Sequence, residues 1–235
     1  MQSDTVNSRS ASLLTRGLLA CGIAAGPLYI IVGLAQALTR EGFDVRRHAL
    51  SLLSNGELGW IQVSNFLVVG ALVIAGALGT RRALFPGRGA TWGPVLLAVY
   101  GVGLIGGGIF PPDPALGFPP GTPPGATSIS RSGLLHFIFG GIGFYALIGA
   151  CFVFARRFAR LQQRGWTVYS SFTGAVFFLA FGAIASGAGS PVVILGFYAA
   201  VAWIWVWHAA LHLKLLNGRV AGSHEPRHGL PAGQA

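Results

Sequence analysis

Long apolar runs separated by short polar segments make up most of the chain. A transmembrane α-helix needs about 20 consecutive, mostly apolar residues, and six windows meet this requirement: 17–38, 60–79, 92–110, 133–155, 167–187 and 192–213. Lipid offers no hydrogen-bond partners to the backbone, and a helix satisfies its backbone N–H and C=O groups internally. The pattern therefore predicts an all-α, polytopic membrane protein with six transmembrane helices. A short Gly-Ala-Gly-Ser-Pro connection between the last two windows predicts an antiparallel hairpin.

Composition agrees with a chain whose main solvent is lipid. Only 9% of the residues are charged and 53% are hydrophobic, whereas a soluble domain carries about 25% charged residues. We expect a cytoplasmic N-terminal segment at 1–16, a six-helix transmembrane domain at 17–214 and a disordered cytoplasmic tail at 215–235.

The net charge of +10 sets the expected orientation. The cations lie between apolar windows, which favours contact with anionic membrane lipids and argues against nucleic acid. Twelve of the 16 Lys and Arg residues fall on one side of the predicted spans, and the other side receives Arg40, Arg46, Arg47 and Arg131. The positive-inside rule therefore places both termini in the cytoplasm and segments 39–59 and 111–132 on the outer face of the inner (plasma) membrane.

Ionisable residues inside a membrane are candidates for function, and this chain has few. No Asp, Glu, Lys or Arg lies in the middle of a window. The only histidines within the windows are His136, His208 and His212. This scarcity argues against a transporter that relies on a carboxylate relay. Glycine runs at 101–108 and 140–143 predict close helix packing or, alternatively, hinges beside a pore.

Polar candidates collect on the outer face. Paired guanidinium groups at Arg46 and Arg47 suit bidentate recognition of a phosphate or carboxylate, with headgroup contact or pairing to an Asp as the alternative. Asp113 and His136 form a candidate acid–base or ligand pair, or an ion pair that fixes the loop. The candidate ligand-binding residues are Asp44, Arg46, Arg47, His48 and Ser51, and the candidate catalytic residues are Asp113 and His136.

Two structural interpretations compete for the first outer segment. If 43–53 is helical, Asp44, His48 and Ser51 share one face and resemble a triad, but one rigid helix rarely aims three such side chains in series. The alternative is an interfacial amphipathic helix with Phe43, Leu50 and Leu53 toward lipid. Ser54-Asn55-Gly56-Glu57 has the spacing of a capping box for the next helix.

The inner end has a weaker constellation. His208 and His212 share a helical face, and with Cys21 and Cys151 they could supply zinc ligands. The alternative is two interfacial histidines beside a band of Trp203, Trp205 and Trp207. The tail sequence 224–228 matches H-E-x-x-H, but Pro226 and the flanking glycines are incompatible with the helix that a metalloprotease needs. We therefore predict no metal centre, and the pattern indicates no particular cofactor.

Several motifs together resemble a known family. The stretch from Gly42 to Ser54 (GFDVRRHALSLLS) followed by Gly59-Trp60, then Gly108-x-Phe110-Pro111-x-Asp113, then Gly133-Leu134-Leu135-His136, occur in that order among six apolar spans. This set is similar to the domain-of-unknown-function family 998 over about residues 17–214. The resemblance implies a prokaryotic inner-membrane protein, supports the outer cluster, and supplies no substrate.

We expect these residues to converge in one outward cleft that binds a lipid headgroup or small anionic molecule, either as a binding site or as an active site. Arg46 and Arg47 would neutralise the anion, and Asp113 and His136 would orient it or move a proton. The second hypothesis is a transporter or flippase-like protein in which the glycine-rich spans move. The third is a membrane scaffold or assembly partner.

Overall fold

The computed structural model describes residues 2–87, 89–125 and 128–223. It consists of α1 (Gln2–Thr39), a short 3₁₀ helix η1 (Leu50–Ser54), α2 (Gly59–Leu84), α3 (Trp92–Ile109), α4 (Arg131–Arg160), α5 (Arg164–Ala185) and α6 (Pro191–Ser223). Six of these helices are long and apolar enough to cross a membrane. The prediction of an all-α protein with six membrane-spanning helices is therefore confirmed.

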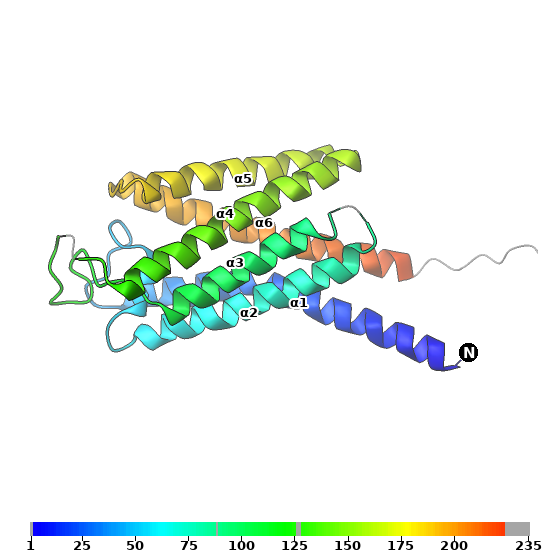
Figure 1. The fold of residues 1–235 in the computed structure, drawn as a ribbon, viewed down its shortest axis with the longest axis horizontal. Helices are drawn as coiled ribbons and strands as arrows, with labels where there is room; N and C mark the ends of the chain where they lie inside the picture. Colours follow the sequence, from blue (N-terminus) through cyan, green and yellow to red (C-terminus); the bar gives the residue numbers. More distant parts are fainter. Residues whose placement is uncertain (1, 88, 126–127, 224–235) are drawn as a thin grey trace, which may run out of the picture.

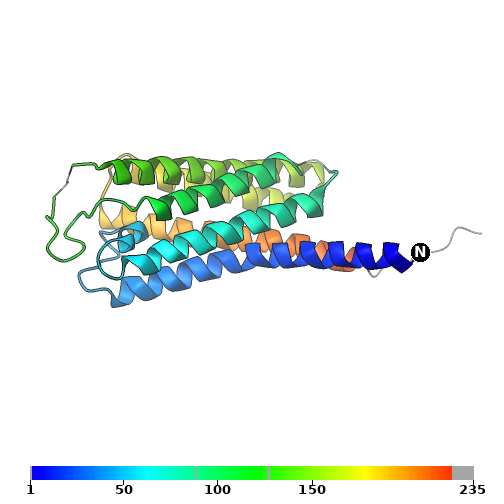
Figure 2. The same cartoon turned by 60° about the horizontal axis from the view of Figure 1, so that its bottom comes forward.

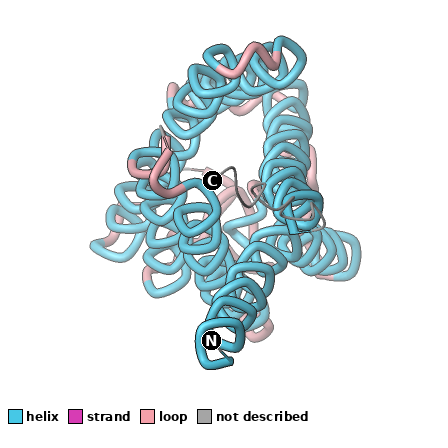
Figure 3. Tube along the Cα trace, turned by 90° about the vertical axis from the view of Figure 1, so that its right-hand side faces the viewer, coloured by secondary structure: helices cyan, strands magenta, loops and turns pink. Residues whose placement is uncertain are grey.

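The six helices form a ring. Each long helix packs against the next one in the chain, and α6 returns to pack against α1. The helices run up and down the long axis (Figures 1 and 2), and a view along that axis shows the ring (Figure 3). The segments 40–58, 110–125, 128–130 and 186–190 lie at one end, which we call the outer end because the cation distribution predicts that it faces away from the cytoplasm.

Several helices are longer than the apolar windows that predicted them. Helix α1 begins at Gln2, within the segment 1–16, and α6 continues through Ser223, within the segment 215–235 that composition predicted to be disordered. A helix can continue past the hydrocarbon layer, because polar side chains are solvated there. Residues 224–235, with the H-E-x-x-H sequence, lie outside the described residues.

Glycines bring α3 close to both of its neighbours. A Cβ atom built on Gly101 would lie 2.8 Å from the carbonyl oxygen of Gly70 in α2. One built on Gly103 would lie 2.8 Å from the Cα of Gly143 in α4. Such separations leave no room for a side chain, so these glycines allow the backbones of adjacent helices to touch. Of the two interpretations of the glycine runs, close packing accounts for these positions.

A second glycine contact joins α1, α2 and α6. A Cβ atom built on Gly76 would lie 2.7 Å from the Cα of Gly22 and 2.8 Å from Nε2 of His212. Gly26 faces Trp205 in the same way, with a built Cβ 3.2 Å from the Trp205 Cβ. The small residues of α1 and α2 thus make room for the large rings of α6.

The three tryptophans of α6 do not form a lipid-facing band, because only Trp203 is exposed. The indole N–H of Trp207 donates to Ser170 Oγ at 3.0 Å, and that of Trp203 donates to Thr173 Oγ1 at 3.0 Å. Trp205 and Trp207 are buried. These two bonds link α5 to α6 and satisfy indole groups that lipid would leave without a partner.

The glycine contact between α2 and His212 leads to a stability prediction. Gly76→Ala places a methyl group against Gly22 and the imidazole, and over-packing of this kind typically costs about 1–3 kcal/mol. We expect a lower melting temperature in a fixed detergent. Gly182→Ala is the matched control, because a Cβ there meets no atom within 4 Å. Equal melting temperatures for the two variants would contradict the close packing described above.

Candidate functional site

Arg40 fixes the first outer segment to the bundle. Its Nη1–H donates to the carbonyl oxygen of Leu53 at 3.2 Å and its Nη2–H donates to that of Asn55 at 2.7 Å. Both acceptors lie at the carboxyl end of η1, where helix carbonyls lack partners within the helix. The guanidinium also lies 5.3 Å from the ring centroid of Phe118 in the second outer segment. Arg40 therefore has a structural role.

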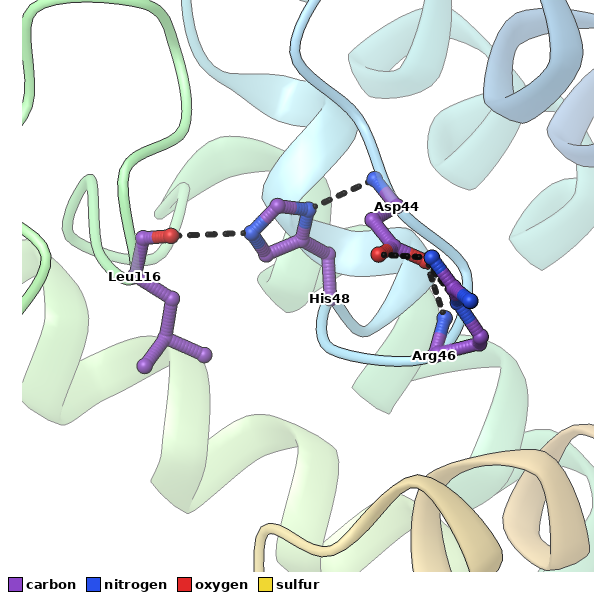
Figure 4. A network of polar contacts seen from close by, with 4 residues as sticks. All are labelled: Asp44, Arg46, His48 and Leu116. Carbon is purple, nitrogen blue, oxygen red and sulfur yellow. Dashed lines mark hydrogen bonds and ion pairs between the residues drawn. The ribbon is translucent and has the colours of Figure 1, made fainter.

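His48 connects three parts of the outer end. Its Nδ1 accepts the backbone N–H of Asp44 at 2.9 Å, and its Nε2 lies 3.1 Å from the carbonyl oxygen of Leu116 (Figure 4). Because an amide N–H only donates and a carbonyl only accepts, the ring hydrogen must be on Nε2. The carbonyl oxygen of His48 accepts the Tyr198 hydroxyl of α6 at 2.8 Å. His48 is buried with both ring nitrogens engaged, so it joins the two outer segments to α6.

Asp44 and Arg46 pair with each other. The guanidinium donates from Nε to Oδ1 and from Nη2 to Oδ2, each at 3.1 Å (Figure 4). Hydrogen bonds from the side chain and backbone of Arg46 lower the pKa of the Asp44 carboxyl group to about 2. The side chain of Arg47 is exposed and makes no hydrogen bond or ion pair with the described residues. Pairing with Asp44, one of the alternatives for Arg46, is therefore what the structure contains.

The first outer segment is not the expected α-helix. Only Leu50–Ser54 is helical, as η1, so Asp44, His48 and Ser51 do not share a helical face and form no triad. Leu50 and Leu53 are buried, and Phe43 packs edge-on against Phe118 with ring centroids 5.1 Å apart. The lipid-facing amphipathic helix is therefore also wrong. The segment folds back over the bundle because its apolar side chains find partners in the second outer segment.

The predicted capping box is wrong as well. Helix α2 begins at Gly59, and its N-cap residue is Leu58, which makes no side-chain cap hydrogen bond. Ser54 belongs to η1, and its buried hydroxyl has no partner among the described residues. The Ser-x-x-Glu spacing suggested a cap, but the chain turns at Gly56 with φ of 75° before α2 starts.

Asp113 and His136 each bind the backbone rather than each other. Oδ2 of Asp113 accepts the backbone N–H of Ser130 at 2.9 Å, and the Ser130 hydroxyl caps α4 by accepting from Gly133 N. A carboxylate is favourable there because the helix dipole is positive at its amino end. A Cβ atom on Gly133 would collide with the Asp113 carboxylate. This arrangement explains why Asp113 and Gly133 occur together in the motif set.

His136 closes the carboxyl end of α3. Its Nδ1 lies 3.0 Å from the carbonyl oxygen of Gly107 and 2.9 Å from that of Phe110. Two carbonyl acceptors require a hydrogen on Nδ1, so Nε2 of the neutral ring is a hydrogen-bond acceptor. His136 is buried, and it lines the cavity described next.

A cavity of about 100 Å³ occupies the outer half of the ring interior. Ser51, His136 and Gly107 line it near the outer ends of their elements, and Tyr29 and Tyr100 line it deeper in the bundle. The hydroxyl groups of Tyr29 and Tyr100 make no hydrogen bond with the described residues. The lining is mostly apolar: Tyr29, Ala49, Leu50, Ser51, Phe66, Tyr100, Gly103, Leu104, Gly107, His136, Gly140, Gly143, Phe144, Phe197, Tyr198 and Val201.

The cavity gathers only part of the predicted cluster. Ser51 and His136 meet in its lining, whereas Asp44, Arg46, Arg47, His48 and Asp113 are not among the lining residues. A ligand in the cavity would touch neutral groups.

The inner histidines and cysteines do not assemble into a ligand set. His208 and His212 lie side by side, with ring centroids 4.4 Å apart, and both are fully buried rather than interfacial. Nδ1 of His212 donates to the His208 carbonyl oxygen at 2.8 Å, and its Nε2 lies 3.3 Å from Thr80 Oγ1. Cys151 faces Gly174 of α5. Among the described residues, no group of three His, Cys, Asp or Glu is placed to hold a metal.

Sequence reasoning missed the tyrosines of the cavity and a buried amide cluster. Tyr29, Tyr100 and Tyr198 are uncharged and lie within apolar windows, so they resemble ordinary core residues. Gln36 and Gln62 are polar residues near the ends of two apolar windows, so the sequence does contain a signal for the amide cluster. A search that had included neutral amides and hydroxyls within spans, and not only ionisable groups, would have found them.

Six helices that are each long and apolar enough to cross a membrane, joined in a ring, identify a multi-pass α-helical membrane protein. The family model described as "Protein of unknown function (DUF998)" matches residues 23–214. The chain therefore belongs to this family, as the outer motifs indicated. No curated protein and no solved structure matches the chain.

The His48 contacts lead to a second prediction. His48→Ala removes both ring hydrogen bonds and leaves the Asp44 N–H and the Leu116 carbonyl without these partners, a loss of about 1–3 kcal/mol. We expect faster protease cleavage within 111–130 and a lower melting temperature. Arg47→Ala is the control, because its side chain is exposed and makes no such bond. Unchanged cleavage in His48→Ala would show that His48 does not hold the outer segments together.

Proposed function

We propose that this protein binds an uncharged, amphiphilic, lipid-class molecule in the cavity of its outer half. The observation that carries the proposal is the lining: apolar side chains surround a few neutral polar groups that have hydrogen-bonding capacity to spare. Ligand sites for apolar molecules typically have this composition. An apolar chain would lie against Phe66, Phe144 and Phe197, and the polar end would reach His136, Ser51 or a tyrosine hydroxyl.

The lining favours a neutral polar group over an anion. None of the lining residues is Lys, Arg, Asp or Glu, and transfer of an unpaired charge into such a site is costly. Arg46 is already bound in bidentate fashion by Asp44. An anion at Arg46 and Arg47 would compete with that carboxylate for the Arg46 guanidinium, so the anion site expected from sequence is a separate proposal.

His136 would orient the ligand. Its Nδ1 is held by the carbonyl oxygens of Gly107 and Phe110, which fixes the ring and leaves Nε2 to accept a hydrogen bond. The tyrosine hydroxyls can donate or accept. The cation distribution supports the further proposal that both termini are cytoplasmic and that the site opens to the outer leaflet of the plasma membrane.

A transporter is the second candidate function, and one observation favours it. The cavity lies between the helices of the ring, with lining residues from α1, η1, α2, α3, α4 and α6. A carrier needs a site of this kind between its membrane-spanning helices. Flux of the bound molecule between vesicle leaflets, blocked by the variant described next, would distinguish transport from binding.

Blocking the cavity should remove the ligand. Gly140 lines the cavity, and a Cβ built there meets no atom within 4 Å, so Gly140→Leu adds a side chain without a backbone collision. We expect native mass spectrometry of the gently solubilised protein to show a retained molecule that this variant loses. Gly141→Leu is the matched control, because Gly141 is equally open but does not line the cavity. Retention of the same molecule in Gly140→Leu would refute the cavity site.

The same measurement separates the cavity from the anion site. We expect an Arg46→Ala/Arg47→Ala double variant to retain the molecule, because neither side chain lines the cavity. Loss of the molecule in this variant, with retention in Gly140→Leu, would instead favour an anion bound at the outer surface.

A further inference from the structure

Three buried amides form a cluster between α1 and α2. Gln36 is 5% exposed, Gln62 is 0% exposed and Asn65 is 4% exposed. Oε1 of Gln62 accepts from Gln36 Nε2 at 2.9 Å and from Asn65 Nδ2 at 3.3 Å. Neutral amides buried beneath η1 and within two membrane-spanning helices are costly unless their hydrogen bonds are made.

The orientation of each amide is fixed by a backbone carbonyl or by its neighbours. Gln36 Nε2 also donates to the carbonyl oxygen of Val32 at 3.2 Å, and Asn65 Nδ2 donates to that of Tyr29 at 3.3 Å. Because carbonyls only accept, the NH₂ ends of Gln36 and Asn65 must point this way. Gln62, which receives from both, must then present its oxygen to them.

This arrangement leaves a defined set of groups without partners among the described residues. They are two acceptors, Gln36 Oε1 and Asn65 Oδ1, and one donor, Gln62 Nε2. Buried polar groups of this kind are nearly always satisfied by protein, water or ligand.

The groups select a neutral partner that both donates and accepts. A cation would meet the NH₂ group of Gln62, which is a donor and cannot coordinate it. An anion would meet two carbonyl-type acceptors. A hydroxyl group can donate to an amide oxygen and accept from the Gln62 NH₂ group.

The cluster adjoins the cavity. The backbone carbonyl of Tyr29 binds Asn65 while Tyr29 itself lines the cavity. We propose that the Gln36–Gln62–Asn65 cluster binds a hydroxyl group, supplied by water or by the headgroup of an amphiphile in the cavity. The second source rests on the proposed function, whereas the first does not.

A structure of the full chain in lipid nanodiscs, at a resolution that shows ordered water, tests the inference. We expect density within hydrogen-bond distance of Gln36 Oε1, Asn65 Oδ1 and Gln62 Nε2. Isolated density identifies water, and density continuous with a chain in the cavity identifies an amphiphile. Amides that pair only with protein, with no density beside them, overturn the inference. A chain in the cavity without density at the cluster overturns the inference and leaves the proposed function standing.

A binding measurement provides a second arm that does not depend on resolution. If an amphiphile supplies the hydroxyl group, we expect 1-hexanol to raise the melting temperature of the wild type more than hexane does. We expect Gln62→Met to lose this additional shift with 1-hexanol and to keep the shift with hexane. Gln36→Met serves if Gln62→Met fails to fold. Equal shifts in melting temperature with 1-hexanol and hexane, together with isolated density beside the amides, show that the bound hydroxyl group belongs to water. An alcohol-specific shift that survives in both variants contradicts recognition by the cluster.

Discussion

Contact between the small residues of α1 and the large rings of α6 turns a row of helices into a ring. Neighbours in the chain pack together in any such bundle, but α1 and α6 are its two ends and need a reason to meet. Gly22 and Gly26 supply it by admitting His212 and Trp205. Trp205 in turn supports Tyr29 and Tyr100, with ring centroids at 5.4 and 5.6 Å. These tyrosines line the cavity, so the cavity depends on closure of the ring.

The outer end is held mainly by bonds from side chains to the backbone. Loops that cover an apolar bundle carry amides and carbonyls that neither lipid nor a helix satisfies. Arg40, His48 and Asp113 provide the missing partners. This explains why polar residues that looked like a ligand site in the sequence form the framework of the outer end. His136 belongs both to this framework and to the cavity lining, because it binds carbonyls at the end of α3 and also lines the cavity.

The number, order and type of the helices could be predicted because an apolar window of sufficient length has few alternatives in a membrane. The sequence indicated which polar residues of the outer end matter, but not which partner each of them binds. Whether Asp113 meets His136 or caps α4 depends on how the second segment folds back, which spacing does not determine. The helical reading of 43–53 failed because packing against Phe118 outweighed local periodicity. The amides and tyrosines were missed because uncharged residues in an apolar window carry no sign of what they face.

Under the proposed function, selectivity in the cavity would arise from the direction of hydrogen bonds. Every polar group in its lining is a hydroxyl or the imidazole of His136, whose Nδ1 is held by two carbonyls. The cations of the outer end, Arg40, Arg46, Arg47 and Arg131, are not among the lining residues. A charged headgroup would lose solvation on entry and find no counter-ion, whereas an alcohol could donate to Nε2 of His136 and accept from a tyrosine. Under the proposed function, a neutral lining would therefore favour an amphiphile with an uncharged headgroup over one with a charged headgroup.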